Sequence, residues 1–192
     1  LLSAPAEAPA QVRKSINALT APELEALRRG VAVMKSRDGA PRNSADWRRS
    51  WVFWANLHGH FGSDCDGPVT GDGMQGVIAW TATNAQERNT WCSCQHRNDS
   101  FLTWHRLAVY QFERVLQQAA GAPTLRLPYW DYAADPALPE AFRNPTYVNE
   151  QGQTVANPLY LPQRAAALNA GTAGIAASAS SAANAMAATS YK

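Results

Sequence analysis

Apolar residues recur at helical spacing in three stretches of this sequence, and the first stretch begins near residue 21. Its apolar positions are three or four residues apart, at Leu24, Leu27, Val31 and Met34. Thr20 and Glu23 precede this stripe with the spacing of a capping box, in which each side chain bonds to the other residue's backbone N–H. The pattern predicts a helix that starts at Ala21, ends before Asp38 and packs in the core.

The second stretch predicts a helix from about residue 45 to residue 57 or 58, with Ser44 as its N-cap. Spacings of four, three and four residues place one histidine on the same face as three indoles, at Trp47, Trp51, Trp54 and His58. We therefore expect His58 to point into the interior. His60 lies beyond Gly59 and about 200° further round a helix, so it should face elsewhere.

The third stretch predicts a helix from near Thr103 to residue 119 or 120, with Gly121 as the residue that follows its C-cap. The same spacing recurs on its expected inward face, at His105, Val109, Phe112 and Leu116. Glu113 belongs to a flanking polar stripe. His105 therefore occupies the first turn of an apolar face, as His58 occupies the last turn of its own.

The remaining sequence predicts irregular structure. Residues 61–90 are rich in Gly, Asp, Thr and Asn, which favours a long loop with a short strand or turn at residues 77–80. Such a long loop usually carries function or a covalent link, and Cys65 and Cys92 lie near its two ends. Further on, the sequence predicts a small hairpin of residues 147–148 and 154–155. Residues 164–186 are dominated by small side chains, which either wrap loosely over the domain or form a closely packed helix.

Composition narrows the class of protein. With 46% hydrophobic and 17% charged residues the chain is globular, and its net charge of +2 gives no reason to expect a nucleic-acid partner. No apolar run approaches the roughly 20 residues that span a bilayer, so we expect no membrane partner. The three cysteines are an odd number, so one of them is free, modified or paired with another chain. Residues 1–19 should form a flexible arm, and cysteine pairing favours a secreted or periplasmic protein.

Three of the four histidines bear on function. His58 and His105 project from helix ends into the expected interior, and His96 lies just before the second of these helices. Burying several imidazoles costs desolvation energy, which a metal ion would offset because neutral imidazole is a natural ligand of copper and zinc. The pattern leaves two interpretations open, a metal site and a set of structural core histidines.

A family resemblance bears on this choice. The segments Cys94-Gln-His96, Phe101-Leu-Thr-Trp-His105-Arg and Phe112-Glu113 together resemble the first copper-binding half of tyrosinases and related polyphenol oxidases. Leu127-Pro-Tyr-Trp-Asp131 and Asn157-Pro-Leu-Tyr160 are similar to segments that follow it there, so the resemblance covers about residues 45–165. It implies a mainly α fold, the helical bundle of type 3 copper proteins with long irregular loops and two copper ions between helix pairs.

Carried over by position, the resemblance implies that His58, His96 and His105 are the three ligands of one copper ion. The alternative is that His60 replaces His58. No side-chain general base is identified beyond the metal ligands, because the residues that distinguish phenol hydroxylation from catechol oxidation lie, by family analogy, near the second copper.

The resemblance also assigns roles to the cysteines and to three neighbouring residues. It implies a thioether crosslink between Cys94 and His96, which would leave Cys65 and Cys92 to form a disulfide across the long loop. A Cys65–Cys94 disulfide and three free thiols are the alternatives. Around the ligands, Asp131 could accept a hydrogen bond from a ligand histidine, or instead cap a helix or pair with an arginine. Phe101 and Phe112 would pack near the copper.

The chain departs from the family in its histidine count. The family pattern has six histidines, three for each copper ion, whereas this sequence has four and none after His105. We therefore expect residues 20–165 to be the first-copper half of a catalytic domain, incomplete in this chain. Residues 166–192 would be an Ala/Ser-rich segment leading to the second half. The other three histidines would come from a second chain or a C-terminal segment.

The activity implied by the resemblance is oxidation of a phenolic small molecule. A phenol or catechol would be converted to an ortho-quinone, as in tyrosinase (a monooxygenase) or catechol oxidase, with two copper ions as cofactor and dioxygen as co-substrate. The enzyme would be active only together with its second-copper half. Two other interpretations stand beside this one: a haemocyanin-like dioxygen carrier, and a mononuclear three-histidine site for zinc or copper that is complete in this chain.

Overall fold

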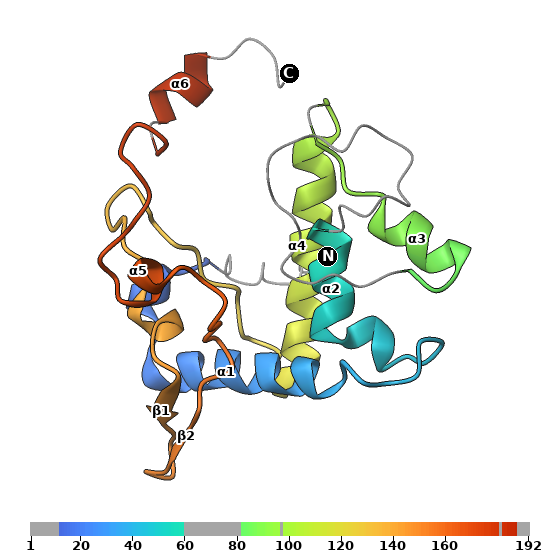
Figure 1. Cartoon of the computed structure of the whole chain (residues 1–192), viewed down its shortest axis with the longest axis horizontal. Helices are drawn as coiled ribbons and strands as arrows, with labels where there is room; N and C mark the ends of the chain where they lie inside the picture. The colour runs from blue at the N-terminus through green and yellow to red at the C-terminus, as the bar shows by residue number, and fades with distance from the viewer. Residues whose placement is uncertain (1–11, 60–81, 97, 181, 188–192) are drawn as a thin grey trace, which may run out of the picture.

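The computed structural model describes residues 12–59, 82–96, 98–180 and 182–187. This part of the chain is mainly helical, as the sequence predicted, and Figure 1 shows its arrangement. The longer helices are α1 (Ala21–Ser36), α2 (Trp51–Gly59), α3 (Ala85–Trp91) and α4 (Phe101–Ala120). The shorter elements are η1 (Ile16–Ala18), η2 (Trp47–Arg49), η3 (Glu140–Phe142), β1 (Thr146–Val148), β2 (Thr154–Ala156), α5 (Ala166–Asn169) and α6 (Ala182–Ala187). No helix among the described residues is both long enough and apolar enough to span a membrane.

Helices α1 and α4 form the main core. In Figure 1, α1 runs across one end of α4, and α2 lies alongside α4. The buried residues at this crossing include the predicted positions Leu27, Val31, Met34 and Leu116. Val109, which was expected on the inward face of α4, is exposed instead. Gly30 allows the close approach, because a Cβ atom there would lie 2.7 Å from Cδ1 of Leu116 and 3.1 Å from its carbonyl oxygen.

The predicted start of α1 and the predicted end of α4 are both present. The capping box at the start of α1 is complete, with Thr20 Oγ1 accepting from the backbone N–H of Glu23 and the Glu23 carboxylate accepting from the N–H of Thr20. Gly121 ends α4 in the left-handed conformation, at φ 61°. Helix α4 begins at Phe101, two residues earlier than the sequence indicated.

The prediction of a single helix from about residue 45 to residue 57 or 58 is wrong. The chain forms the short turn η2 and then α2, because Ser50 adopts an extended conformation with ψ 159° between them. Ser50 Oγ accepts from the backbone N–H of Phe53, so this serine caps α2. The break turns Trp47 away from the face of Trp51 and Trp54. Trp47 instead packs with Phe53 and Trp91 in a second core cluster.

Helix α3 lies within the stretch that was expected to be loop. Asn84 caps it by accepting from the backbone N–H of Glu87, and Trp91 at its end is fully buried. The expected strand or turn at residues 77–80 lies outside the described residues. The sequence Asn84-Ala-Gln-Glu87 carries the capping signal that would have predicted this helix.

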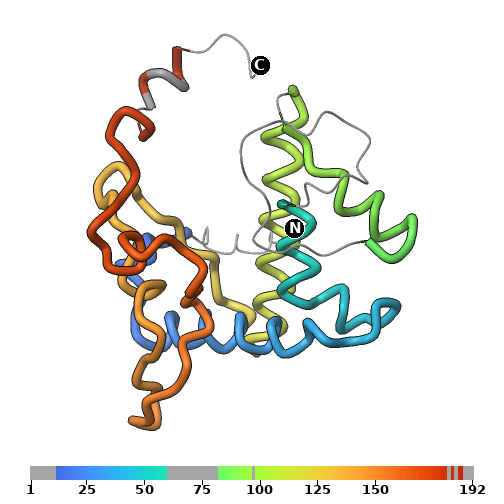
Figure 2. The backbone as a smooth tube through the Cα atoms, viewed as in Figure 1, coloured from blue at the N-terminus to red at the C-terminus, as the bar shows by residue number. Residues whose placement is uncertain are grey.

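After α4 the chain runs to the far end of α1 and returns, as the tube in Figure 2 shows. It contacts the N-terminal segment there, where the backbone N–H of Ile16 donates to the carbonyl of Tyr129 and Ile16 is buried. The expectation of a flexible arm up to residue 19 is therefore wrong for Lys14–Ala18. The predicted hairpin is present as the antiparallel pair β1–β2. The small-residue segment is mostly irregular, with the two short helices α5 and α6.

Candidate metal centre

Three histidines from three separate segments converge in the structure. His58 lies near the end of α2, His96 lies between α3 and α4, and His105 lies in the second turn of α4. One ring nitrogen of each can be chosen so that all three lie within 4.8 Å of one another. The rings of His96 and His105 stack with 5.3 Å between centroids, and the ring of His58 lies edge-on to that of His105, also at 5.3 Å.

His105 is oriented by its own helix. Its Nδ1 atom lies 2.7 Å from the carbonyl oxygen of Phe101, one turn earlier, so an N–H at this position donates to the carbonyl. This bond leaves Nε2 as the free lone pair, which is the arrangement that metal-bound histidines usually show. The Phe101 ring also packs against both neighbouring imidazoles, 4.3 Å from His105 and 5.9 Å from His96 between centroids.

Cys94 lies against the same two rings. Its Sγ atom is 3.5 Å from Nε2 of His96 and 3.7 Å from Nε2 of His105. The thiol is free, which does not support the alternative disulfide with Cys65. Burial raises its pKa to about 11, so the sulfur is protonated at neutral pH. The thioether to His96 stays a prediction, although the sulfur is within contact distance of that ring.

His58 does not point into a closed interior, contrary to the sequence-based expectation. Its side chain is exposed, at the edge of a hollow of about 340 Å³ lined by Trp51, Trp54, Val109 and Phe112 among others. The apolar wall still buries part of the ring and lowers the pKa of His58, and positive charge on His105 or His96 would lower it further. His58 is exposed because nothing among the described residues covers this face of α2 and α4. Because partial burial lowers the pKa of His58, a neutral imidazole is favoured at this position.

The structure separates the remaining candidates. Phe112 packs against Trp51 and Trp54, with 6.1 and 5.8 Å between ring centroids, and so lines the hollow beside the histidines. Asp131 is exposed, and its carboxylate accepts from the backbone N–H of Ala134 in a turn. That is closer to the capping alternative than to a bond with a ligand histidine. Cys65 and His60 lie outside the described residues, so the Cys65–Cys92 disulfide and the His60 alternative stay predictions.

Sequence reasoning missed the surroundings of Glu113. It was placed on a flanking polar stripe but is buried, because Arg13 pairs with its carboxylate at 2.7 Å and the backbone N–H of Leu127 donates to it at 2.8 Å. Arg126 lies 3.9 Å from the second oxygen. These contacts tie α4 to the N-terminal segment and to the chain just after α4, which helical spacing could not show.

Comparison with known proteins decides the family. The model of the common central domain of tyrosinase matches residues 48–188 of the sequence. The chain belongs to the tyrosinase family. Tyrosinase from Streptomyces antibioticus is 37% identical over 59 residues, which are 31% of this chain and 21% of that protein. Chloroplastic polyphenol oxidase A1 from Vicia faba is 26% identical over 156 residues, 81% of this chain and 21% of that protein.

The chain is also similar to a protein of a different named kind. Hemocyanin 2 from Megathura crenulata is 27% identical over 142 residues, 73% of this chain and 3% of that protein. Among solved structures, tyrosinase from Burkholderia thailandensis is similar with 22% identity and a TM-score of 0.49, covering 78% of this chain and 25% of that chain. This tyrosinase-family chain therefore matches about a fifth or less of the length of the Streptomyces, Vicia and Megathura proteins.

The histidine set fits the metal that the tyrosinase family uses, which is copper. The donors are all imidazoles, which suit copper, and one of them already has its Nε2 atom directed away from the Phe101 hydrogen bond. Nitrogens bound to one ion at about 2.0–2.1 Å lie roughly 3.5 Å apart, so donors within 4.8 Å need only small ring rotations to converge.

Proposed function

We propose that this chain holds one copper ion through His58, His96 and His105, and that it forms part of an enzyme that oxidises phenols or catechols to ortho-quinones with dioxygen. The observation that carries this proposal is the convergence of the three imidazoles within 4.8 Å in a chain of the tyrosinase family. Copper, when bound, supplies the redox chemistry with dioxygen. The chain's own residues supply the ligand geometry and an apolar wall.

Each ligand has a distinct role in this proposal. His105 is the most strongly oriented, because the carbonyl of Phe101 holds its Nδ1–H and directs Nε2 toward the other rings. His96 stacks on His105 and shares contacts with Cys94. His58 closes the triad from α2, and its lowered pKa keeps its imidazole neutral and ready to bind at neutral pH.

We propose that a second copper-binding part covers the face of α2 and α4 beside the triad. This part would be a second chain or a C-terminal segment with the other three histidines. The face is apolar, since Trp51, Trp54 and Phe112 line its hollow, and the exposed side chains Leu102 and Val109 extend it. Soluble proteins rarely leave such surface uncovered, which supports a partner that packs there.

Metal binding is tested first, by titrating the metal-free chain with copper in a calorimeter and counting bound ions by elemental analysis. We expect one ion per chain, and loss of binding in His58→Gln, His96→Gln and His105→Gln. His60→Gln is the matched control and should bind copper as the wild type does. Loss of binding in His60→Gln with normal binding in His58→Gln would replace His58 by His60 in the ligand set.

Activity is tested on the copper-loaded chain with a catechol and a monophenol, alone and mixed with a separate segment of a tyrosinase-family protein that carries the second-copper histidines. We expect quinone formation only in the mixture. Val109→Glu places a charge on the apolar face and should abolish the effect of mixing, whereas Gln111→Glu, an exposed position on the other side of α4, should not. Turnover by the chain alone would contradict the need for a second part.

A second candidate function is a dioxygen carrier, which the similarity to Hemocyanin 2 favours. Reversible dioxygen binding by the mixture without turnover of catechol would support it. The third candidate is a mononuclear three-histidine site. One bound ion per chain with affinity unchanged by the second part, together with no quinone formation in the mixture, would favour that site.

A further inference from the structure

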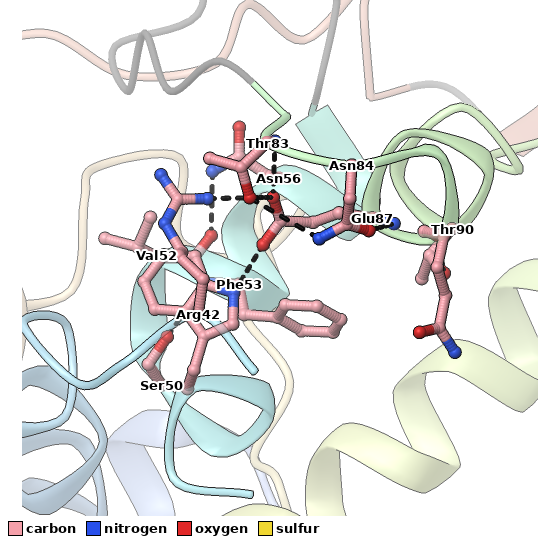
Figure 3. Close-up of polar contacts among 11 residues, drawn as sticks. Arg42, Ser50, Val52, Phe53, Asn56, Thr83, Asn84, Glu87 and Thr90 are labelled. Carbon is pink, nitrogen blue, oxygen red and sulfur yellow. Dashed lines mark hydrogen bonds and ion pairs between the residues drawn. The ribbon is translucent and has the colours of Figure 1, made fainter. Parts of the chain in front are cut away.

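Glu87 is a buried carboxylate, only 5% exposed, in the first turn of α3. It accepts hydrogen bonds from Arg42 at 2.9 Å and from Trp47 Nε1 at 2.6 Å, both of which precede α2. It also accepts from the backbone N–H of Thr83 at 2.8 Å and from the Thr83 hydroxyl at 2.9 Å. Figure 3 shows Arg42, Thr83 and Asn84 gathered around this side chain.

These contacts use most of the hydrogen-bonding capacity of the carboxylate. Two ionised oxygens offer about four acceptor positions. Arg42 and both donors of Thr83 meet Oε2, and Trp47 meets Oε1. Burial alone would raise the pKa of Glu87, but hydrogen bonds from Thr83, Trp47 and Arg42 outweigh burial and lower it. The carboxylate is therefore a charged link between these chain segments.

Aromatic packing reinforces this link between the segments. Trp47 and Phe53 come from η2 and α2, and each packs against Trp91 at the end of α3, with 6.5 and 6.0 Å between ring centroids. The Arg42 guanidinium also lies 4.1 Å from the centre of the Trp47 ring. The polar network thus fixes α3 to the segment that precedes α2, and the ring cluster fixes α3 to α2 itself through Phe53.

Two of the three histidines lie on the chain segments that this link holds together. Helix α2 carries His58 in its last turn, and the chain leaves α3 at Trp91 only five residues before His96. We propose that Glu87 is a positioning residue that sets the separation of His58 from His96 and thereby the affinity of the triad for copper. His105 belongs to α4, which packs on α1, and the carbonyl of Phe101 in α4 holds its ring, so it should be less affected. This inference rests on the proposed role of the triad as a metal site.

The first test is Glu87→Gln, which keeps the shape of the side chain but removes the charge that faces Arg42. Changes to groups that bond a metal ligand directly typically cost about 10–100-fold in affinity. Glu87 acts through the placement of helices instead, so we expect a loss at the lower end of that range, about 10-fold, for copper. Glu23→Gln is the matched control. Glu23 also forms an ion pair, with Lys14, and it belongs to the capping box with Thr20. It lies on α1, which carries no histidine. The control should leave copper affinity unchanged.

A second readout separates positioning from general destabilisation and needs no metal. In the metal-free chain with labelled histidines, NMR signals of His58 and His96 should shift more in Glu87→Gln than that of the His105 Nδ1–H, which the Phe101 carbonyl holds. Unchanged signals in a folded Glu87→Gln variant would overturn the inference, as would equal shifts of all three rings. If the wild type itself binds no copper, the proposed metal site fails, while the NMR comparison still reports whether Glu87 positions the two histidines.

Discussion

The Nδ1 atom of His105 and the carbonyl oxygen of Phe101 lie 2.7 Å apart, within one turn of α4. A helix carbonyl accepts but does not donate, so the neutral imidazole must carry its proton on Nδ1. We expect nitrogen NMR of the metal-free chain at alkaline pH to show the Nδ1–H tautomer for His105. A dominant Nε2–H tautomer would contradict this geometry and leave His105 without a preformed ligand atom.

The contact of Cys94 with His96 predicts a crosslink once copper and dioxygen are present. Forming a thioether removes the S–H hydrogen and one ring C–H hydrogen, and dioxygen takes up these two hydrogens and their electrons. We expect the intact mass of the aerobically copper-loaded chain to fall by about 2 Da, the mass of two hydrogens, relative to the metal-free chain. Cys94→Ser should show no such loss, and an unchanged mass in the wild type would show that Cys94 stays a thiol.

The crossing of α1 and α4 predicts a large penalty at Gly30. Glycine-to-alanine changes inside helices normally stabilise by about 0.5–1 kcal/mol. At Gly30 the new Cβ would lie 3.1 Å from a backbone oxygen of Leu116, which cannot move alone, so we expect Gly30→Ala to destabilise by about 1–3 kcal/mol. Urea unfolding measures the difference. Gly39→Ala, with nothing within 4 Å of the new atom, is the control and should cost little.

The capping box at Thr20 and Glu23 predicts a pH-dependent contribution to stability. Hydrogen bonds from Lys14 and Thr20 lower the pKa of Glu23 to about 2. Because the folded pKa is depressed, the contribution is complete above the unfolded value of about 4.3 and is lost as pH falls toward 2. Glu23→Gln should therefore unfold at lower urea than the wild type at pH 7, and the gap should narrow between pH 4 and pH 3. A gap that stays constant over this range would show that the charge of Glu23 contributes nothing.

Local signals predicted those parts of the fold that depend on neighbouring residues. The capping box and stripe of α1, the left-handed Gly121 that ends α4 and the hairpin β1–β2 all follow from contacts within a few positions. His58 and His105 were found by their place at helix ends. Their convergence with His96 is a tertiary fact that spacing alone could not provide.

The errors have physical causes of the same kind. Spacings of four and three residues joined Trp47, Trp51 and Trp54 into one face, but Ser50 caps a new helix between them and sends Trp47 into a different cluster. The solvent exposure of His58 depends on what covers α2 and α4, which no pattern inside the helix records. Glu113 is buried because Arg13 reaches it from the N-terminal segment and the backbone of Leu127 bonds to it after α4 has ended.

The division of α4 into two environments has an evolutionary consequence. Leu116, in the buried half, is eleven residues beyond His105, or about 17 Å along the helix axis. We expect substitutions near His105 to affect the proposed metal site more than the packing of the core, and substitutions near Leu116 to affect the core more than the site. One rigid helix thus lets selection adjust chemistry and foldability almost independently.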